Sequence, residues 1–146
     1  MSKSIYIPFD LSRLLIKDST NLTIPSDYLN RSDITSLSIP IHWDLKRIVI
    51  GTDCFGSVRL FELDGLSGLE SVKVKRQSFK SSDGERNDGV CRIVNCPKFK
   101  SLEIGDGSFC DYHSFELGNL PSLQFIDIGQ NCFDCAPSFS LTGLNN

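Results

Sequence analysis

The chain has 146 residues, about the size of one ordinary domain. Hydrophobic residues make up 40% and charged residues 23%, which argues against a disordered chain, and no apolar run approaches the ~18 residues that cross a bilayer. The 15 basic and 18 acidic residues leave a net charge of −3, so the charge provides no basis for nucleic-acid binding.

The first ten residues, MSKSIYIPFD, contain neither the apolar segment nor the small-residue cleavage site of a secretory signal. We therefore expect a cytoplasmic protein, or a surface protein if the chain is a fragment of a longer one. Because the cytosol keeps thiols reduced, the six cysteines are expected to be thiols rather than disulfides.

Residues 1–44 are predicted to form one or more divergent N-terminal coils, or a cap. Leu22 and Ile24 are spaced by two, as are Leu37 and Ile39, and both pairs match apolar positions of the repeat that follows. A divergent first coil is what the end of a repeat array needs, because that coil has a neighbour on only one side.

Residues 45–146 are predicted to form four repeats of the 24-residue type. The units begin at Leu45, Leu69, Phe99 and Leu123, so the second unit is six residues longer than the others. We assign the extra length to an insertion at residues 80–90, which contains the polar sequence SSDGERNDG.

Each unit contains two pairs of apolar residues spaced by two, at positions 4 and 6 and at positions 17 and 19 of the unit. This alternation is that of a strand with one face in a core, so each unit is predicted to supply two short strands. Position 7 is glycine in three units and is predicted to form a turn with positive φ. Position 11 is phenylalanine in every unit: Phe55, Phe79, Phe109 and Phe133.

Charged residues occupy the positions that point outward. Position 2 reads Lys46, Glu70, Lys100 and Gln124; position 5 reads Val49, Lys73, Glu103 and Asp127; position 18 reads Glu62, Arg92, Glu116 and Ser140. The sign of the charge alternates at positions 2 and 18, and position 5 has one opposite-charge and one like-charge step. Opposite charges on neighbouring strands are mildly stabilising, which supports this alignment of the units.

A single unit cannot bury its apolar residues alone, so successive units are expected to stack. The predicted fold is mainly β: a right-handed repeat solenoid of about five coils with two short parallel sheets and short or no helices. Stacking places equal positions about 4.8 Å apart, so the phenylalanines of position 11 are predicted to form a column of rings.

The pattern LxxIxIG(x)3F(x)5FxL(x)2L, with its 24-residue period, resembles the leucine-rich repeat superfamily, in particular the divergent BspA-like repeats of bacteria and protists. The resemblance covers Leu45 to Asn146 and extends more loosely over Leu22 to Asp44. Where the leucine-rich consensus has Asn or Cys after LxxLxL, this chain has Gly, which favours a flat, two-sheeted coil over a horseshoe with outer helices. The resemblance implies a protein-interaction scaffold.

Four of the six cysteines are explained by the repeat. Cys54 and Cys132 occupy position 10, where the other units carry serine, and Cys91 and Cys96 stand where other units carry Phe and Leu. We interpret these four as small or apolar core residues, which is how cysteine thiols usually behave.

The sequence gives less support to metal-binding sites. Cys110, His113 and Cys135 fall in one turn region of adjacent units and form the best zinc hypothesis. In DGERNDG, the glycine is misplaced for a calcium loop and Val94 stands where the bidentate Glu belongs, so a solvated loop is preferred. No catalytic motif of the GxSxG, phosphate-loop or HExxH type occurs, so we predict neither an enzyme nor a cofactor.

The leading hypothesis is a non-catalytic scaffold that binds an unknown protein partner, as a monomer or as part of a longer array. The alternatives are a surface or adhesin-type repeat protein and, less favoured, a β-helix enzyme acting on polysaccharide. Outward and aromatic positions supply the candidate partner-binding residues, which are Phe125, Glu103, Lys73, Asp127, Tyr112 and Trp43.

Overall fold

The computed structural model describes residues 20–27, 30, 35–39, 44–80, 89–133 and 138–142. Within these ranges the chain contains ten strands and no helix, as the composition and the apolar spacing predict. The predictions for residues 1–19, for Trp43, for Cys135 and for residues 81–88 of the insertion lie outside the described residues.

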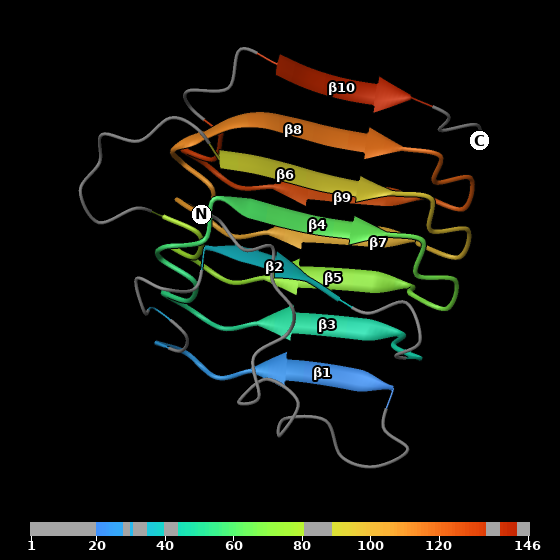
Figure 1. The fold of residues 1–146 in the computed structure, drawn as a ribbon, viewed down its shortest axis with the longest axis horizontal. Helices are drawn as coiled ribbons and strands as arrows, with labels where there is room; N and C mark the ends of the chain where they lie inside the picture. The colour runs from blue at the N-terminus through green and yellow to red at the C-terminus, as the bar shows by residue number, and fades with distance from the viewer. Residues whose placement is uncertain are drawn as a thin grey trace.

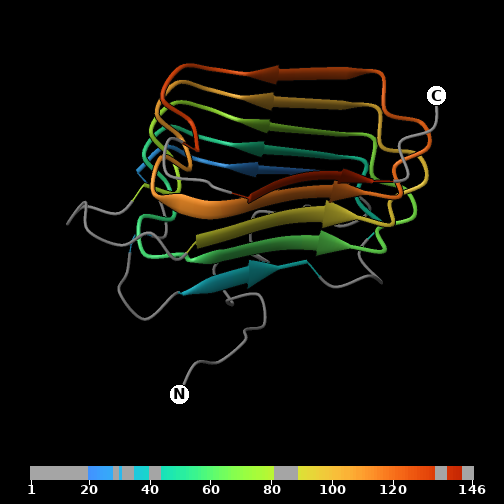
Figure 2. The same cartoon turned by 90° about the horizontal axis from the view of Figure 1, so that it is seen from above.

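The strands form two five-stranded sheets, and the chain alternates between them (Figure 1). Sheet A has the order β1 (Asn21–Ile24), β3 (Arg47–Ile50), β5 (Ser71–Val74), β7 (Ser101–Ile104) and β9 (Phe125–Ile128). Sheet B has the order β2 (Ser36–Ser38), β4 (Leu60–Asp64), β6 (Gly89–Val94), β8 (Tyr112–Gly118) and β10 (Ser138–Thr142). Figure 2 shows the sheets as two layers whose strands run in opposite directions.

All neighbouring strands within a sheet are parallel, and they pair at equivalent positions of successive units. In sheet A, Ile48 pairs with Val72, which pairs with Leu102. In sheet B, Phe61 pairs with Cys91. The prediction of two short parallel sheets, with like positions side by side, is confirmed.

The core lies between the two sheets and contains the column of rings predicted from position 11. Phe55, Phe79, Phe109 and Phe133 follow one another with ring centroids 5.1, 4.5 and 5.2 Å apart, and their planes differ by 20° or less. The first three rings are fully buried and Phe133 is 8% exposed. Burial of these rings supplies a large part of the hydrophobic stabilisation.

The phenylalanines of the column have left-handed backbone conformations, which the sequence pattern does not predict. Their φ angles lie between 56° and 59°. This region costs a bulky L-residue about 1–2 kcal/mol. Burial of the ring and a backbone hydrogen bond to the preceding unit offset that cost; the N–H of Phe79 donates to the Cys54 carbonyl at 2.9 Å, and that of Phe109 donates to the Ser78 carbonyl at 3.0 Å.

Position 10 forms a ladder of hydrogen bonds beside the ring column. At each unit its hydroxyl or thiol donates to a carbonyl in the preceding unit, at 2.6 to 3.2 Å; the donors are Cys54, Ser78, Ser108 and Cys132. Cys54 is fully buried in the core and Cys132 packs against it, as predicted for small core residues; the repeat pattern did not predict that their thiols also donate hydrogen bonds. Both thiols replace a serine hydroxyl as donors, because the carbonyl of the preceding unit needs a partner inside the turn.

The prediction of positive φ at the position 7 glycines is wrong; the described glycines with positive φ are Gly65 and Gly107. Position 7 is glycine because the preceding unit lies too close for a side chain. A Cβ atom at Gly51 would stand 2.6 Å from the Ser26 nitrogen, and one at Gly105 would stand 2.8 Å from the Arg76 nitrogen.

The inward side chains of β9 differ from those of the strands before it. Ile126, at position 4, is 39% exposed, whereas Ile48, Val72 and Leu102 at the same position are at most 2% exposed. The prediction that position 4 is buried in every unit is wrong for this one. β9 is an outer strand of sheet A, but β1 is one as well, and Leu22 on β1 is 1% exposed, so an outer position alone does not expose Ile126.

Candidate functional site

The outward side chains of sheet A form one surface, which we call the sheet A face. Positions 3 and 5 of each unit point outward because positions 4 and 6 are buried. Lys73, Glu103 and Asp127 pair in register across β5, β7 and β9. Phe125, on the same side of β9 as Asp127, is 49% exposed. The structure thus brings together four of the six residues that the sequence suggests for partner binding.

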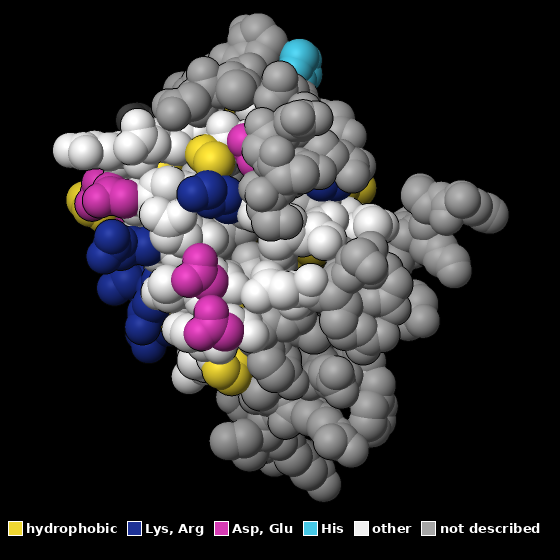
Figure 3. Space-filling model, turned by 90° about the vertical axis from the view of Figure 1, so that its left-hand side faces the viewer, with side chains coloured by type: hydrophobic (Ala, Val, Ile, Leu, Met, Phe, Trp, Pro, Cys, Tyr) yellow, Lys and Arg dark blue, Asp and Glu magenta, His cyan; other side chains and the backbone are white. Residues whose placement is uncertain are grey.

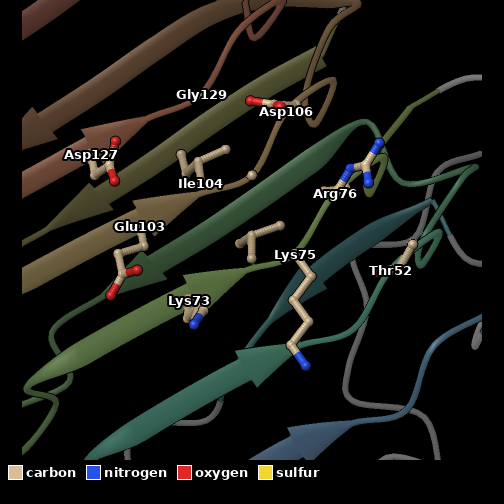
Figure 4. A pocket seen from close by; sticks show the side chains of 11 residues that line it. Thr52, Lys73, Lys75, Arg76, Glu103, Ile104, Asp106, Asp127 and Gly129 are labelled. Atoms are coloured by element: carbon tan, nitrogen blue, oxygen red, sulfur yellow. The ribbon is translucent and has the colours of Figure 1, made fainter.

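A shallow depression of about 420 Å³ lies where β5, β7 and β9 end. Its charged lining residues are Lys73, Lys75, Arg76, Glu103, Asp106 and Asp127. Figure 4 shows Lys73, Glu103 and Asp127 in a row across the three strands, with Arg76 and Asp106 on the turns beyond them. Figure 3 looks onto the end of the molecule at which these strands stop, and there basic side chains lie along the left edge with acidic side chains above them.

Hydrogen bonds to the next unit hold the turns that border the depression. One carboxylate oxygen of Asp106 accepts the Gln130 N–H at 2.9 Å. Three units earlier in the stack, the hydroxyl of Ser26 accepts the Thr52 N–H at 3.0 Å in the same way. These hydrogen bonds tie the turns that border the depression to the neighbouring units.

Among the described residues that line the depression there is no histidine. In the described ranges, no three His, Cys, Asp or Glu side chains converge as metal ligands. Two of the three proposed zinc ligands can be placed: His113 is exposed on β8 and Cys110 is half-buried. The third, Cys135, is outside these ranges. Opposite charges beside an exposed aromatic ring are suited to binding a polypeptide.

Tyr112 is not available to a partner, so its prediction as a binding residue is wrong. Its side chain is fully buried, its hydroxyl donates to the Val58 carbonyl at 2.5 Å, and its ring meets that of Phe109 edge to face at 4.9 Å. The ring has room because its neighbour in β6 is Gly89, where a Cβ atom would clash with it. Gly89, at the end of the insertion, was the one feature of the sequence that could have indicated that Tyr112 is buried.

The outer side of sheet B is occupied by its own charges. Arg92 binds Glu62 at 2.7 Å and Glu116 at 2.8 Å, as the alternating signs of position 18 predict. Hydrogen bonds to Glu116 and then Glu62 raise the pKa of the Arg92 guanidinium. Because these groups neutralise one another, we assign this surface a structural role.

A second ladder, which sequence reasoning missed, runs along the end of sheet B. The amide of Asn119 donates to Asn95, and that of Asn95 donates to Asp64, each at 2.9 Å. Both asparagines have positive φ and stand just after the second strand of their unit. Asparagine tolerates this conformation, and its side chain joins one unit to the next.

Comparison of the chain with models of protein families, with curated proteins and with solved structures finds no match in any of the three. In the part of the chain that the structure describes, no helix is long and apolar enough to cross a membrane.

Proposed function

We propose that the chain is a right-handed repeat solenoid of about five coils, similar to the leucine-rich repeats, and that it acts as a non-catalytic protein-binding scaffold. The alternation of the chain between two parallel sheets and the alignment of like positions support this architecture. In such a scaffold, inward residues maintain the fold while outward residues are available for recognition.

The binding surface in this proposal is the sheet A face. The observation that carries it is Phe125, an exposed aromatic ring at a position where the neighbouring units carry Ser101, Ser71 and Arg47. An aromatic side chain beside small residues and charges of both signs is typical of the anchors that dominate protein interfaces. Among the described residues, the exposed large hydrophobic side chains are Phe125 and Ile126, both on β9, and charged residues on the outer side of sheet B bind one another.

A selection of random peptides against the purified chain tests the proposal without knowledge of the natural partner. We expect the selected peptides to bind Phe125→Ala at least about tenfold more weakly than wild type, which corresponds to one hot-spot residue. His113→Ala, an equally exposed change on β8, is the matched control and is expected to bind normally. Selected peptides that bind both variants equally well would place the site elsewhere.

A further inference from the structure

The units that contain β5 and β7 carry opposite charges at equivalent positions. At positions 2, 5 and 8 the pairs are Glu70 with Lys100, Lys73 with Glu103, and Arg76 with Asp106, and all six side chains are exposed or half-exposed. Lys73 and Glu103 lie on the sheet A face, Arg76 and Asp106 line the depression beside them, and Glu70 and Lys100 precede the two strands. No other described element lies over the sheet A face (Figure 2).

We propose that the partner on this face is a second copy of the chain, an inference that rests on the proposed function and departs from the expected monomer. Consider a two-fold axis parallel to the strands, in front of the face and midway between β5 and β7. Rotation about this axis reverses the order of the strands, so that β5 of one copy faces β7 of the other. Each residue then faces the residue at the same position of the repeat in the second copy. Lys73 then faces Glu103 of the second copy, and Arg76 faces Asp106 of the second copy.

The same rotation brings β3 opposite β9, while β1 has no strand opposite it. Arg47, which is exposed, then faces Phe125 of the second copy, and a guanidinium over an aromatic ring is a favourable contact. Between these pairs, Ser71 faces Ser101 of the second copy, and two small side chains let the sheets approach each other. The exposed ring of Phe125 is thereby covered.

Other face-to-face arrangements are disfavoured by the same charges. An axis along the stacking direction would place each strand opposite its own copy, so Lys73 would face Lys73 and Glu103 would face Glu103. Like charges in contact oppose association and suppress wrong arrangements. The sign pattern therefore selects the axis parallel to the strands.

The size of the face predicts a weak dimer. The axis overlaps four strands, β3, β5, β7 and β9; spaced about 4.8 Å apart, each with its flanking residues contributing about seven residues of about 3.3 Å, they present roughly 440 Å² per copy. A dimer then buries roughly 900 Å², less than the ~1,200–2,000 Å² of stable interfaces. Because ion pairs contribute much of the attraction, salt is expected to weaken the dimer.

Analytical ultracentrifugation of a concentration series, at low and high salt, tests this inference. Wild type is expected to show a reversible monomer–dimer equilibrium that salt shifts toward monomer. Lys73→Glu and Glu103→Lys are each expected to weaken self-association by about tenfold or more, since each change places like charges opposite each other at two symmetry-related points across the two-fold axis. Lys98→Glu, the same charge change at an exposed turn, is the matched control.

Mixing the two variants is the decisive measurement. In a heterodimer of Lys73→Glu with Glu103→Lys, the first variant carries glutamate at both positions and the second carries lysine at both. Both facing pairs are again oppositely charged, so the mixture is expected to dimerise more strongly than either variant alone. A defect within one monomer cannot be repaired by mixing. If either variant fails to fold in a thermal melt, Arg76→Glu and Asp106→Lys give the same test at position 8.

The outcomes separate this inference from the proposed function. Wild type that stays monomeric, with peptides that still depend on Phe125, overturns the dimer and leaves the binding scaffold in place. A dimer that both variants retain, or that mixing does not restore, overturns the proposed two-fold arrangement. Wild type that stays monomeric, with selected peptides that bind Phe125→Ala as well as wild type, contradicts both proposals.

Discussion

Truncation of Phe109 to alanine tests the ring column on which the packing depends. The Phe109 ring is fully buried and lies 4.5 Å from Phe79, 4.9 Å from Tyr112, 5.2 Å from Phe133 and 5.8 Å from Phe61 between centroids. A buried Phe→Ala change costs about 3–5 kcal/mol, and each aromatic pair contributes about 0.5–1.5 kcal/mol beyond burial. Because alanine removes the ring from the middle of this aromatic cluster, we expect a cost near the upper end, about 4–5 kcal/mol.

The backbone gives no compensation, because alanine retains a Cβ atom at the left-handed φ of 57°. Urea denaturation measures the effect; with a slope of about 2 kcal/mol/M the midpoint is expected to fall by roughly 2 M. Phe109→Leu, which keeps most of the volume, serves if the alanine variant does not fold. Phe125→Ala is the surface control and is expected to change stability by less than about 0.5 kcal/mol. A loss below about 1.5 kcal/mol for Phe109→Ala would show that this ring is not packed in the column.

Two further predictions concern the interior. Ser78→Ala removes both the donor to the Gly51 carbonyl and the acceptor of the Cys54 N–H, so we expect urea denaturation to show a loss of about 2–4 kcal/mol in the free energy of unfolding. Ser78→Cys keeps a donor and is expected to cost less than half as much. Equal losses for the two variants would contradict the hydrogen-bond ladder at position 10. Burial raises the pKa of the Cys91 thiol, so above the unfolded pKa of about 8.5 only the unfolded chain loses this proton and stability falls as pH rises. Under reducing conditions wild type is therefore expected to lose about 2 kcal/mol more than Cys91→Val between pH 8 and pH 10, and identical pH dependences would mean that the thiol titrates normally in the folded state.

Much of the candidate site was predictable from the sequence, because it follows from the repeat. Once positions 4 and 6 are assigned to the core, position 5 must point outward, which places Lys73, Glu103 and Asp127 in one row. The exposure of Phe125 follows from the same rule. Tyr112 was misassigned because β8 begins earlier than the repeat predicts and Gly89 makes room for the ring.

By itself, the sequence determined which side chains face the core and which neighbours they meet, because a spacing of two within a strand and a period of 24 residues between strands are both readable along the chain. Only the tertiary structure decided the left-handed conformation at Phe109, the donor role of Cys54 and the exposure of Ile126. The first two depend on backbone groups of an adjacent unit, which the spacing of apolar residues within a unit does not describe. Burial is thus encoded locally as a pattern, whereas turn conformation and hydrogen bonding arise from contacts between units.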